Sequence, residues 1–256
     1  MNISIIFTVL DSHKAVDRQL RYFENMPLPD DVELILVDDG STPPLKEFLY
    51  QDHRPKNLRI LRQDIDAEWT QPAARNYGAR EALGEFLILS DIDHIICKPL
   101  IDFVAKGEWD AMRFNREVAI LDEDGDFVQD DETMLEYGYL QWRLEQNKYT
   151  IPPHVNSFGI RKKLYLELGG MDERRVGTSK YPNHDDSRLR NRLNRLRQEG
   201  AIRYCPEDQW PIIYMFPNGK YAGDVDHNPF GLFHDLSRKN EENKQWRLQQ
   251  RGKFQR

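Results

Sequence analysis

Short apolar runs and amphipathic stretches alternate through the first hundred residues of the chain. Four apolar runs are typical of buried strands, at residues 3–7, 32–37, 58–61 and 86–89. Between them, apolar positions three or four residues apart predict helices, at residues 16–23, 45–49 and 72–83. Strands that alternate with helices in this way indicate an α/β fold with a mostly parallel central sheet.

The pattern changes after Pro99. Short strands are expected there, at residues 110–114, 118–121 and 127–128. Apolar positions at helical spacing recur in two later segments and predict helices at residues 162–168 and 185–199. We therefore expect a single domain over residues 1–256, with a first half that ends at about residue 98 and a second half over residues 99–256.

Two carboxylates follow the buried run at residues 86–89. Asp91 and Asp93 are two positions apart, so in an extended chain both side chains point the same way. In open α/β sheets, ligands bind at the carboxyl ends of the strands. Paired carboxylates suit Mg²⁺ or Mn²⁺, and such an ion typically holds a substrate diphosphate. The alternative is a solvated strand end that binds no metal.

Other polar residues also fall at predicted strand ends. The first strand ends at residues 8–12, and the second ends at Asp38 and Asp39. A carboxylate at the end of the second strand is suited to accept hydrogen bonds from a nucleobase or ribose. Arg75 lies in the helix before the central strand, and a guanidinium there is suited to a diphosphate or a base edge. The alternative for Arg75 is an exposed helix arginine.

The composition is that of a soluble globular protein, with 39% hydrophobic and 31% charged residues among 256. The net charge of −7 argues against broad nucleic-acid binding. The longest apolar runs are far shorter than a transmembrane segment. The chain opens directly on a strand without a basic signal region, and its two cysteines, Cys97 and Cys205, fit a reducing compartment. We therefore expect a cytoplasmic protein.

Several segments resemble glycosyltransferases. Three segments of the first half are similar to the nucleotide half of family 2 glycosyltransferases with the GT-A fold, at residues 37–41, 74–78 and 89–93. Three segments of the second half resemble the β-1,4-galactosyltransferase group, at residues 158–172, 184–193 and 234–243. The similarity spans about residues 1 to 245. It implies a Rossmann-like nucleotide-diphospho-sugar transferase fold.

The resemblance implies a role for individual residues at the donor site. Four would bind the nucleotide, expected to be uridine: Thr8, Asp38, Asp39 and Arg75. Asp93 would be the direct metal ligand, and Asp91 would contact the ribose or a metal-bound water. His234 would complete the site for Mn²⁺, with Mg²⁺ as the alternative ion. His227 competes with His234 as the ligand. His13, His53 and His154 are expected to be surface or loop residues.

The resemblance also implies an acceptor site. Asp186 would be the general base, and Asp185 would hold the acceptor hydroxyls. The family's tryptophan before this acidic motif is missing, and Tyr181 would replace it as a platform for the sugar. Trp142, in a polar and aromatic stretch at residues 130–150, is the best candidate for a further acceptor contact. Five arginines crowd the helix that follows Asp186. They indicate either a solvated basic face, or an anionic acceptor or peripheral contact with a membrane surface.

These observations predict an inverting, metal-dependent glycosyltransferase that moves a hexose or N-acetylhexosamine from a UDP-sugar to a glycan hydroxyl. UDP-galactose, UDP-GalNAc and UDP-glucose are the expected donors. A nucleotidyltransferase is one alternative, but the loop at residues 8–12 has no glycine for a triphosphate. A degenerate sugar-nucleotide or glycan-binding module is the other. Asp91, Asp93, Asp186 and His234 are all present, which disfavours it.

Overall fold

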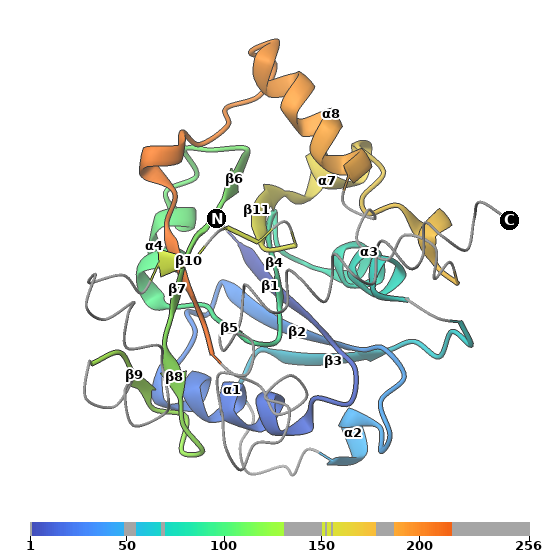
Figure 1. The fold of residues 1–256 in the computed structure, drawn as a ribbon, viewed down its shortest axis with the longest axis vertical. Coiled ribbons are helices and arrows are strands. Elements are labelled where there is room, and N and C mark those ends of the chain that lie inside the picture. Colours follow the sequence, from blue (N-terminus) through green and yellow to red (C-terminus); the bar gives the residue numbers. More distant parts are fainter. Residues whose placement is uncertain are drawn as a thin grey trace, which may run out of the picture.

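The computed structural model describes residues 2–48, 55–67, 70–130, 150–151, 153–154, 156–177 and 187–216. Its centre is a six-stranded sheet (Figure 1). Four of its strands are parallel: β1 (Ile3–Val9), β2 (Val32–Asp38), β3 (Leu58–Arg62) and β4 (Phe86–Asp91). Two antiparallel strands complete it: β11 (Phe158–Arg161) and β6 (Ala111–Arg113). The predicted α/β fold with a mostly parallel sheet is therefore confirmed.

The strand order in this sheet is β3-β2-β1-β4-β11-β6. The chain therefore passes from β1 outward to β2 and β3, and then returns to place β4 on the other side of β1. Such a reversal opens a crevice at the carboxyl ends of the strands, and open α/β sheets bind their ligands there. Because β11 and β6 come from the second half of the sequence, both halves contribute to one sheet.

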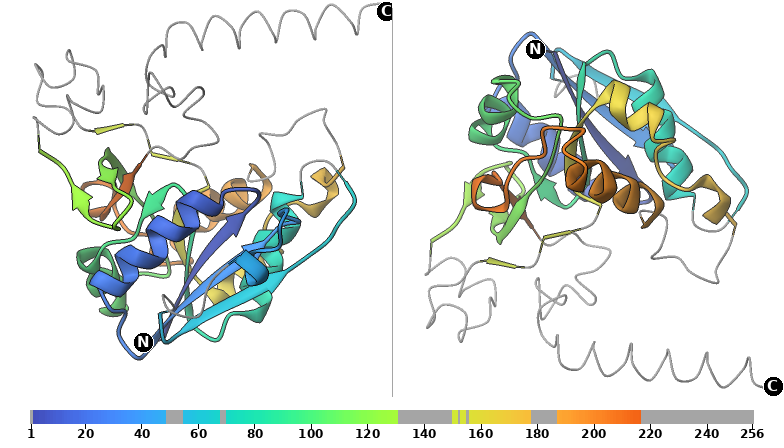
Figure 2. Two further views of the ribbon diagram at one scale, coloured as in Figure 1. Left: turned by 90° about the horizontal axis from the view of Figure 1, so that it is seen from below. Right: turned by 90° about the horizontal axis from the view of Figure 1, so that it is seen from above.

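Helices cover both faces of the sheet (Figure 2). On one face lie α1 (His13–Asn25) and α4 (Lys98–Ala105), whose apolar residues pack in one cluster with Ile5 and Phe7 of β1. On the other face lie α3 (Gln71–Glu81), α7 (Lys162–Glu167) and α8 (Ser187–Gln198), which pack in a second cluster with Ile6. The strands β1, β2 and β4 are buried on both faces, which explains their continuous apolar runs.

A second sheet lies beside the first. It has the order β10 (Thr150–Ile151), β7 (Asn115–Val118), β12 (Ile212–Met215) and β5 (His94–Ile95). A separate pair is formed by β8 (Ile120–Leu121) and β9 (Phe127–Val128). The chain leaves the large sheet at Asp91, turns at residues 92–93 and enters the small sheet at His94. The acidic pair therefore lies at the point where the chain passes between the two sheets, with Asp91 at the end of β4 and Asp93 in the turn.

The remaining elements are short: α2 (Leu45–Phe48) and the 3₁₀ helices η1 (Glu173–Arg175) and η2 (Glu207–Gln209). The predicted helices at residues 16–23, 72–83 and 162–168 match α1, α3 and α7 closely. The sequence did not lead us to expect α4, β11 or β12. Among the described residues, no helix is long and apolar enough to cross a membrane.

Candidate active site

The predicted donor-site residues lie together at the carboxyl edge of the large sheet. Thr8 of β1 is the register partner of Asp91 of β4, and Val9 is the partner of Asp38 at the end of β2. Thr8 is buried, and its hydroxyl has no hydrogen-bond partner among the described residues. The parallel register thus brings Thr8 and both carboxylates to the carboxyl edge of the sheet, where the strand order reverses.

Asp38 fixes the loop that follows β2. Its carboxylate accepts hydrogen bonds from the backbone N–H groups of Ser41 at 2.8 Å and Leu45 at 3.0 Å, and from Arg62 at 2.6 Å. Burial alone would raise the pKa of Asp38, but these donors hold it below its ordinary value. Since the carboxylate is buried and both oxygens are engaged, Asp38 shapes the loop that carries Asp39.

Asp39 is oriented differently. Its backbone N–H donates to the carbonyl of Val9 at 2.8 Å, which ties the loop to β1. Its two carboxylate oxygens accept one side-chain hydrogen bond each, from Gln63 at 2.7 Å and from Thr70 at 2.8 Å. Burial raises the pKa of Asp39 despite these two donors. The three side chains form a polar group beside the end of β1.

Asp91 is held by three side chains from two parts of the chain. Arg75 of α3 pairs with its Oδ1 atom, and Gln71 donates to the same oxygen at 3.2 Å. The Nδ1 atom of His154 lies 3.0 Å from Oδ2. Burial alone would raise the pKa of Asp91, but Arg75 and then His154 outweigh it and hold the pKa well below its ordinary value. Asp91 is therefore an anion at any physiological pH.

Arg75 is a buried cation and not an exposed helix arginine. Its side chain is 1% exposed, and only its Nη2 atom contacts Asp91. Its Nε and Nη1 atoms are buried and have no hydrogen-bond partner among the described residues. Buried guanidinium N–H groups are costly to leave unpaired. Arg75 therefore has donors available for an anionic or polar ligand at this edge of the sheet.

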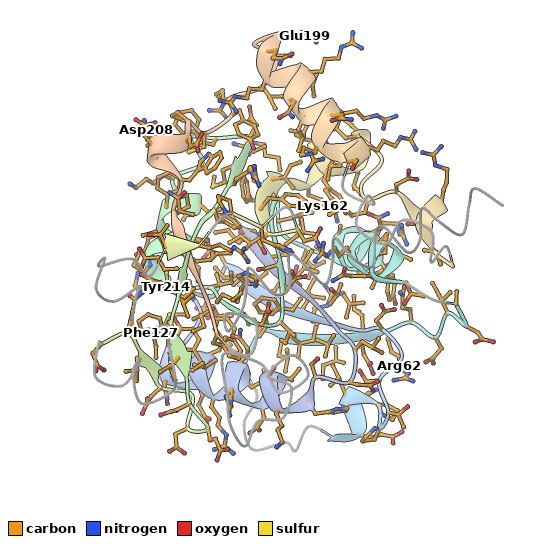
Figure 3. The ribbon with its side chains drawn as sticks, viewed as in Figure 1. Arg62, Phe127, Lys162, Glu199, Asp208 and Tyr214 are labelled. Atoms are coloured by element: carbon orange, nitrogen blue, oxygen red, sulfur yellow. The ribbon has the colours of Figure 1, made fainter. Side chains whose placement is uncertain are left out.

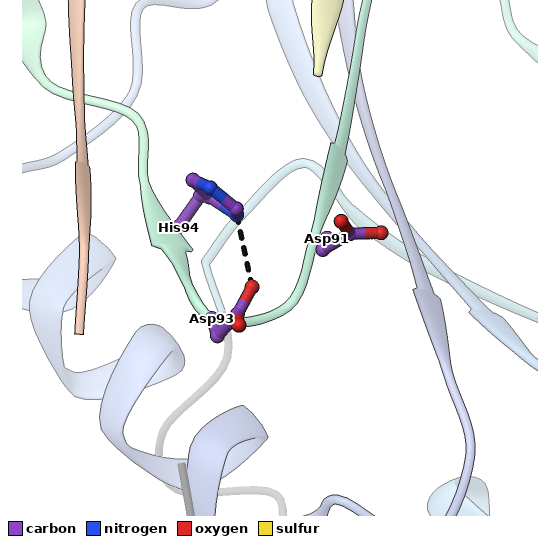
Figure 4. A group of neighbouring side chains, drawn as sticks. All are labelled: Asp91, Asp93 and His94. Carbon is purple, nitrogen blue, oxygen red and sulfur yellow. Dashed lines mark ion pairs between the residues drawn. The ribbon is translucent and has the colours of Figure 1, made fainter. Parts of the chain in front are cut away.

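Asp93 lies in the turn after β4, and His94 is the first residue of β5 (Figure 4). One potential ligand atom from each of Asp91, Asp93 and His94 lies within 4.8 Å of the others. The Nδ1 atom of His94 lies 2.9 Å from Oδ1 of Asp93, without hydrogen-bond alignment. Buried Gln19 of α1 donates to the carbonyls of Ile92 at 3.1 Å and His94 at 2.7 Å. These two hydrogen bonds fix the turn against α1.

Arg116 of β7 determines the tautomer of His94. Its Nη1 atom lies 3.3 Å from Nε2 of His94. An arginine donates hydrogen bonds and cannot accept them, so Nε2 is the acceptor and the proton of a neutral ring lies on Nδ1. Burial lowers the pKa of Arg116, while Asp93 and Asp91 act in the opposite direction. The Nδ1 side of a neutral His94, which faces Asp93 without hydrogen-bond alignment, therefore has no lone pair for a metal.

The donor set fits a divalent cation. Two carboxylates converge beside a cluster of buried polar groups, and Oδ1 of Asp93 is buried without a hydrogen-bond donor among the described residues. Oxygen ligands of this kind suit Mn²⁺ or Mg²⁺. Oδ1 of Asp91 is already paired with Arg75 and accepts a hydrogen bond from Gln71, whereas Oδ1 of Asp93 has no hydrogen-bond donor among the described residues, so Asp93 is the better placed direct ligand. Asp91 and His94 would then lie beside the ion without being its main protein ligands.

The predicted acceptor-site residues fall outside the described part of the chain. These are Trp142, Tyr181, Asp185 and Asp186, together with His234 and its competitor His227. Their roles stay predictions. Sequence reasoning did not identify Gln71, His94, Arg116 or His154 as members of the site. His154, which we expected to be a surface or loop residue, lies against Asp91, and only the folded chain brings it there.

The fold and this cluster define the chain as a member of the GT-A class of glycosyltransferase folds. The chain belongs to the glycosyltransferase-like family 2, whose model matches residues 4–198. No curated protein sequence is significantly similar to it.

The solved structures that match the chain are distant in sequence. Residues 1–349 of TarS from S. aureus match with 17% identity and a TM-score of 0.53, over 84% of this chain and 60% of that one. The same TarS fragment in complex with UDP matches with 16% identity and a TM-score of 0.53, again over 84% and 60%. A mannosyltransferase from Pyrobaculum calidifontis, in complex with GDP-Man and Mn²⁺, matches with 14% identity and a TM-score of 0.49, over 83% and 56%. This chain thus spans about three fifths of the length of the TarS fragment.

Proposed function

We propose that the chain is an inverting, metal-dependent glycosyltransferase that moves a hexose or N-acetylhexosamine from a UDP-sugar to a glycan hydroxyl. One observation carries the proposal: Asp91 and Asp93 converge at the carboxyl edge of β4, beside buried Arg75, where the strand order reverses. Glycosyl transfer requires stabilisation of a leaving nucleoside diphosphate. A divalent ion next to a buried guanidinium is suited to that task.

The nucleotide would lie over the ends of β1 and β2. Asp39, with Gln63 and Thr70 around it, offers the polar group for a base or ribose. Thr8 and Arg75 contribute the buried donors that have no partner among the described residues. Asp38 would act by holding the loop in place. The UDP complex of the TarS fragment supports uridine as the base, because that protein has the same fold.

Asp93 would hold the ion directly, with Asp91 contacting the ribose or a metal-bound water. Mn²⁺ is the preferred ion and Mg²⁺ the alternative. When bound, the ion would offset the charge that develops on the leaving diphosphate. His234, or His227 in its place, would be a further protein ligand. His94 would contribute through its N–H group, because Arg116 occupies its other nitrogen.

The acceptor would enter from the second half of the chain. From the sequence resemblance to the β-1,4-galactosyltransferase group we infer that Asp186 would be the base, that Asp185 would bind the acceptor, and that Tyr181 and Trp142 would contact the sugar. In a single displacement, the acceptor oxygen bonds to C1 of the donor sugar as the bond from C1 to the diphosphate breaks. The hydroxyl proton passes to Asp186, and the anomeric centre inverts.

Two other functions make different demands on the site. A nucleotidyltransferase would need a glycine-rich loop for a triphosphate after β1, and residues 8–12 contain no glycine. A sugar-nucleotide or glycan-binding module would need no general base and would release no diphosphate. A single domain and a cytoplasmic location complete the proposal, with a UDP-sugar and a glycan or glycoconjugate as the partners and no nucleic acid.

A panel of nucleotide sugars tests the function directly. The protein is incubated with UDP-, GDP- and CMP-sugars in Mn²⁺, in Mg²⁺ or in a chelator, and release of nucleoside diphosphate or monophosphate is scored. We expect UDP release from UDP-galactose, UDP-GalNAc or UDP-glucose with Mn²⁺, and none with the chelator. Asp93→Asn is the matched inactive variant. Binding of UDP-sugars without any turnover, across an acceptor panel, would favour the binding module.

A further inference from the structure

One polar residue interrupts the apolar face of α1. Helical spacing places four buried residues on one side of this helix: Val16, Gln19, Leu20 and Phe23. The three apolar ones belong to the cluster that also contains Ile92. Glutamine is rarely buried completely in a folded protein, yet Gln19 is 0% exposed. Its presence on this face is therefore explained by its hydrogen bonds and not by apolar burial.

The amide of Gln19 binds the backbone on both sides of Asp93. Its Nε2 atom carries two hydrogens, and it donates to the carbonyl of Ile92 at 3.1 Å and to the carbonyl of His94 at 2.7 Å. The Oε1 atom of Gln19 is buried and has no hydrogen-bond partner among the described residues. Desolvation of this oxygen partly offsets the stability that the two hydrogen bonds contribute. Stability alone is therefore a weak explanation for a glutamine at this position.

The carbonyl of Asp93 itself is bound by a different element. The backbone N–H of Phe216, the residue after β12, donates to it at 2.9 Å. The strand β12 pairs with β5 and β7, and its Tyr214 lies beside β7 in Figure 3. All three carbonyls of residues 92–94 are thus fixed, two of them by a helix and one by the end of a strand.

These contacts determine the direction of the Asp93 side chain. Peptide groups are planar, so the backbone conformation at Asp93 is set by the orientations of the two peptide groups that flank its Cα atom. Gln19 binds the carbonyl of the first peptide group, and Phe216 binds the carbonyl of the second. With both groups held, the bond from Cα to Cβ of Asp93 has a fixed direction.

Asp93 depends on its backbone more than Asp91 does. Arg75 pairs with Oδ1 of Asp91, and Gln71 donates to the same oxygen at 3.2 Å, so side chains orient that carboxylate directly. Oδ1 of Asp93 is buried without a hydrogen-bond donor among the described residues. The position of the Asp93 carboxylate therefore follows chiefly from the conformation of the turn.

We propose that Gln19 is a positioning residue of the metal site. By fixing the peptide group before Asp93, it holds the Asp93 carboxylate where it can bind a divalent cation. Gln19 acts through the backbone carbonyls of Ile92 and His94 and is not itself a ligand. The inference rests on the proposed function in one respect only, which is that Asp93 binds the ion. Residues that hold a metal ligand from behind typically change metal affinity by about 10–100-fold when they are lost.

Gln19→Met tests the inference, because methionine is unbranched and apolar like its neighbours but has no hydrogen-bond donor. Electron paramagnetic resonance of free Mn²⁺ in the presence of UDP measures the metal affinity of the full chain. We expect a loss of about tenfold, and a changed spectrum of the bound ion at saturating Mn²⁺. UDP affinity in a chelator should equal that of the parent. Gln19→Asn, whose amide is one methylene shorter, should change Mn²⁺ affinity in the same direction and replaces Gln19→Met in every comparison should that variant not fold.

Ser4→Ala is the matched control. Ser4 is also 0% exposed, and its hydroxyl donates to Glu33 and accepts from the backbone N–H of Gly84 at 2.8 Å. It lies near the start of β1, at the opposite end of the strand from Thr8. Both variants should melt at a lower temperature than the parent, because each removes buried hydrogen bonds. Ser4→Ala should nevertheless keep the parent spectrum and a Mn²⁺ affinity within about twofold of the parent.

A double variant tests whether Gln19 acts through Asp93. In the Asp93→Ala background, Gln19→Met should weaken Mn²⁺ binding by less than about twofold, because the carboxylate that it positions is gone. An equal loss in both backgrounds would overturn the inference, and so would parent affinity in folded Gln19→Met or a similar loss in Ser4→Ala. A parent that does not bind Mn²⁺ would overturn it together with the metal dependence of the proposed function. Weaker Mn²⁺ binding in Gln19→Met, in a protein that transfers no sugar, would preserve the inference and reject the proposed function alone.

Discussion

The side-chain oxygen of Asn76 occupies the space that a Cβ atom on Gly170 would need. That oxygen accepts hydrogen bonds from the hydroxyl of Tyr165 at 2.6 Å and the backbone N–H of Met171 at 2.9 Å. The amide nitrogen of Asn76 donates to the carbonyl of Met171 at 2.9 Å and to Glu173 at 2.8 Å. Asn76 thus joins α3, whose Arg75 pairs with Asp91, to the segment that leads toward the predicted base.

Gly170→Ala tests this close contact. Gly170 has a φ of +60°, and Gly200 has a φ of +66° with nothing within 4 Å of its Cβ position. Both alanines should cost about 1–2 kcal/mol for the left-handed backbone. Gly170→Ala should cost about 1–3 kcal/mol more, because it also displaces Asn76. Urea unfolding of both variants measures the difference. Equal losses would mean that Asn76 moves aside freely.

The nucleotide half of the fold could be predicted from the sequence. The strands β1, β2 and β4 are buried on both faces, and local apolar runs therefore identify them. The acidic pair at the end of β4 follows from the same local pattern. These features depend on neighbouring residues, which a single sequence displays directly.

The second half depends on contacts between distant segments. The strand β7 reads Asn-Arg-Glu-Val and carries no apolar run, because only one of its four residues is fully buried. The strand β11 contains Gly159, where the ring of Phe86 takes the space of a Cβ atom. Neither strand can therefore be recognised from its own residues alone. The same reason explains why Arg116 and His154 were missed, since the fold brings both from other elements to the acidic pair.

Asp110 should make stability depend on pH. It accepts hydrogen bonds from the backbone and side chain of Arg203, and Arg161 pairs with it at 2.8 Å. The Arg203 side chain is the main cause that lowers the pKa of Asp110 to about 2. The unfolded pKa is about 3.9, so the stabilisation is complete above about pH 4 and is lost as the pH falls toward 2.

Asp110→Asn should remove this contribution. We expect a loss of about 1–2 kcal/mol at neutral pH, after allowance for solvent screening, and a flatter stability profile between about pH 4 and 2. Asp102→Asn, which breaks the largely exposed pair with Lys98, is the control and should change stability by less than about 0.5 kcal/mol. Thermal melts across this pH range measure both. A parent-like profile in Asp110→Asn would show that another group causes the acid loss.

The histidine ligand of the metal can be identified by comparing three variants. Asp93→Asn should lower Mn²⁺ affinity by about 100-fold or more, and His234→Ala by a similar factor, as expected for direct ligands. His94→Asn keeps an N–H group near Asp93 and should cost about tenfold, at the lower end of the roughly 10–100-fold range of residues that act behind a ligand. Electron paramagnetic resonance of free Mn²⁺ in the presence of UDP measures all three. A loss in His94→Asn as large as that in Asp93→Asn would make His94 a direct ligand.

Asp39→Ala tests the nucleotide pocket. Its carboxylate is grouped with Gln63 and Thr70 at the ligand-binding edge, so its removal should weaken UDP binding by about 1–3 kcal/mol while the protein stays folded. Asp30→Ala provides the control, because Asp30 lies just before the other end of β2 and pairs with exposed Lys56. Calorimetry with UDP and Mn²⁺ should show parent affinity for that variant. Unchanged affinity in folded Asp39→Ala would place the base elsewhere.

The last prediction concerns the base. Asp185 and Asp186 directly precede α8, so either one also has the sequence position of a helix cap. Asparagine caps a helix about as well as aspartate, but it cannot take a proton from the acceptor hydroxyl. A positioned base contributes roughly 10²–10⁴-fold to rate. Asp186→Asn should therefore keep the melting temperature and the UDP–Mn²⁺ affinity and lose most of the transfer. Asp185→Asn should raise acceptor KM more than it lowers kcat. Transfer at near the parent rate in Asp186→Asn would show that a different residue is the base.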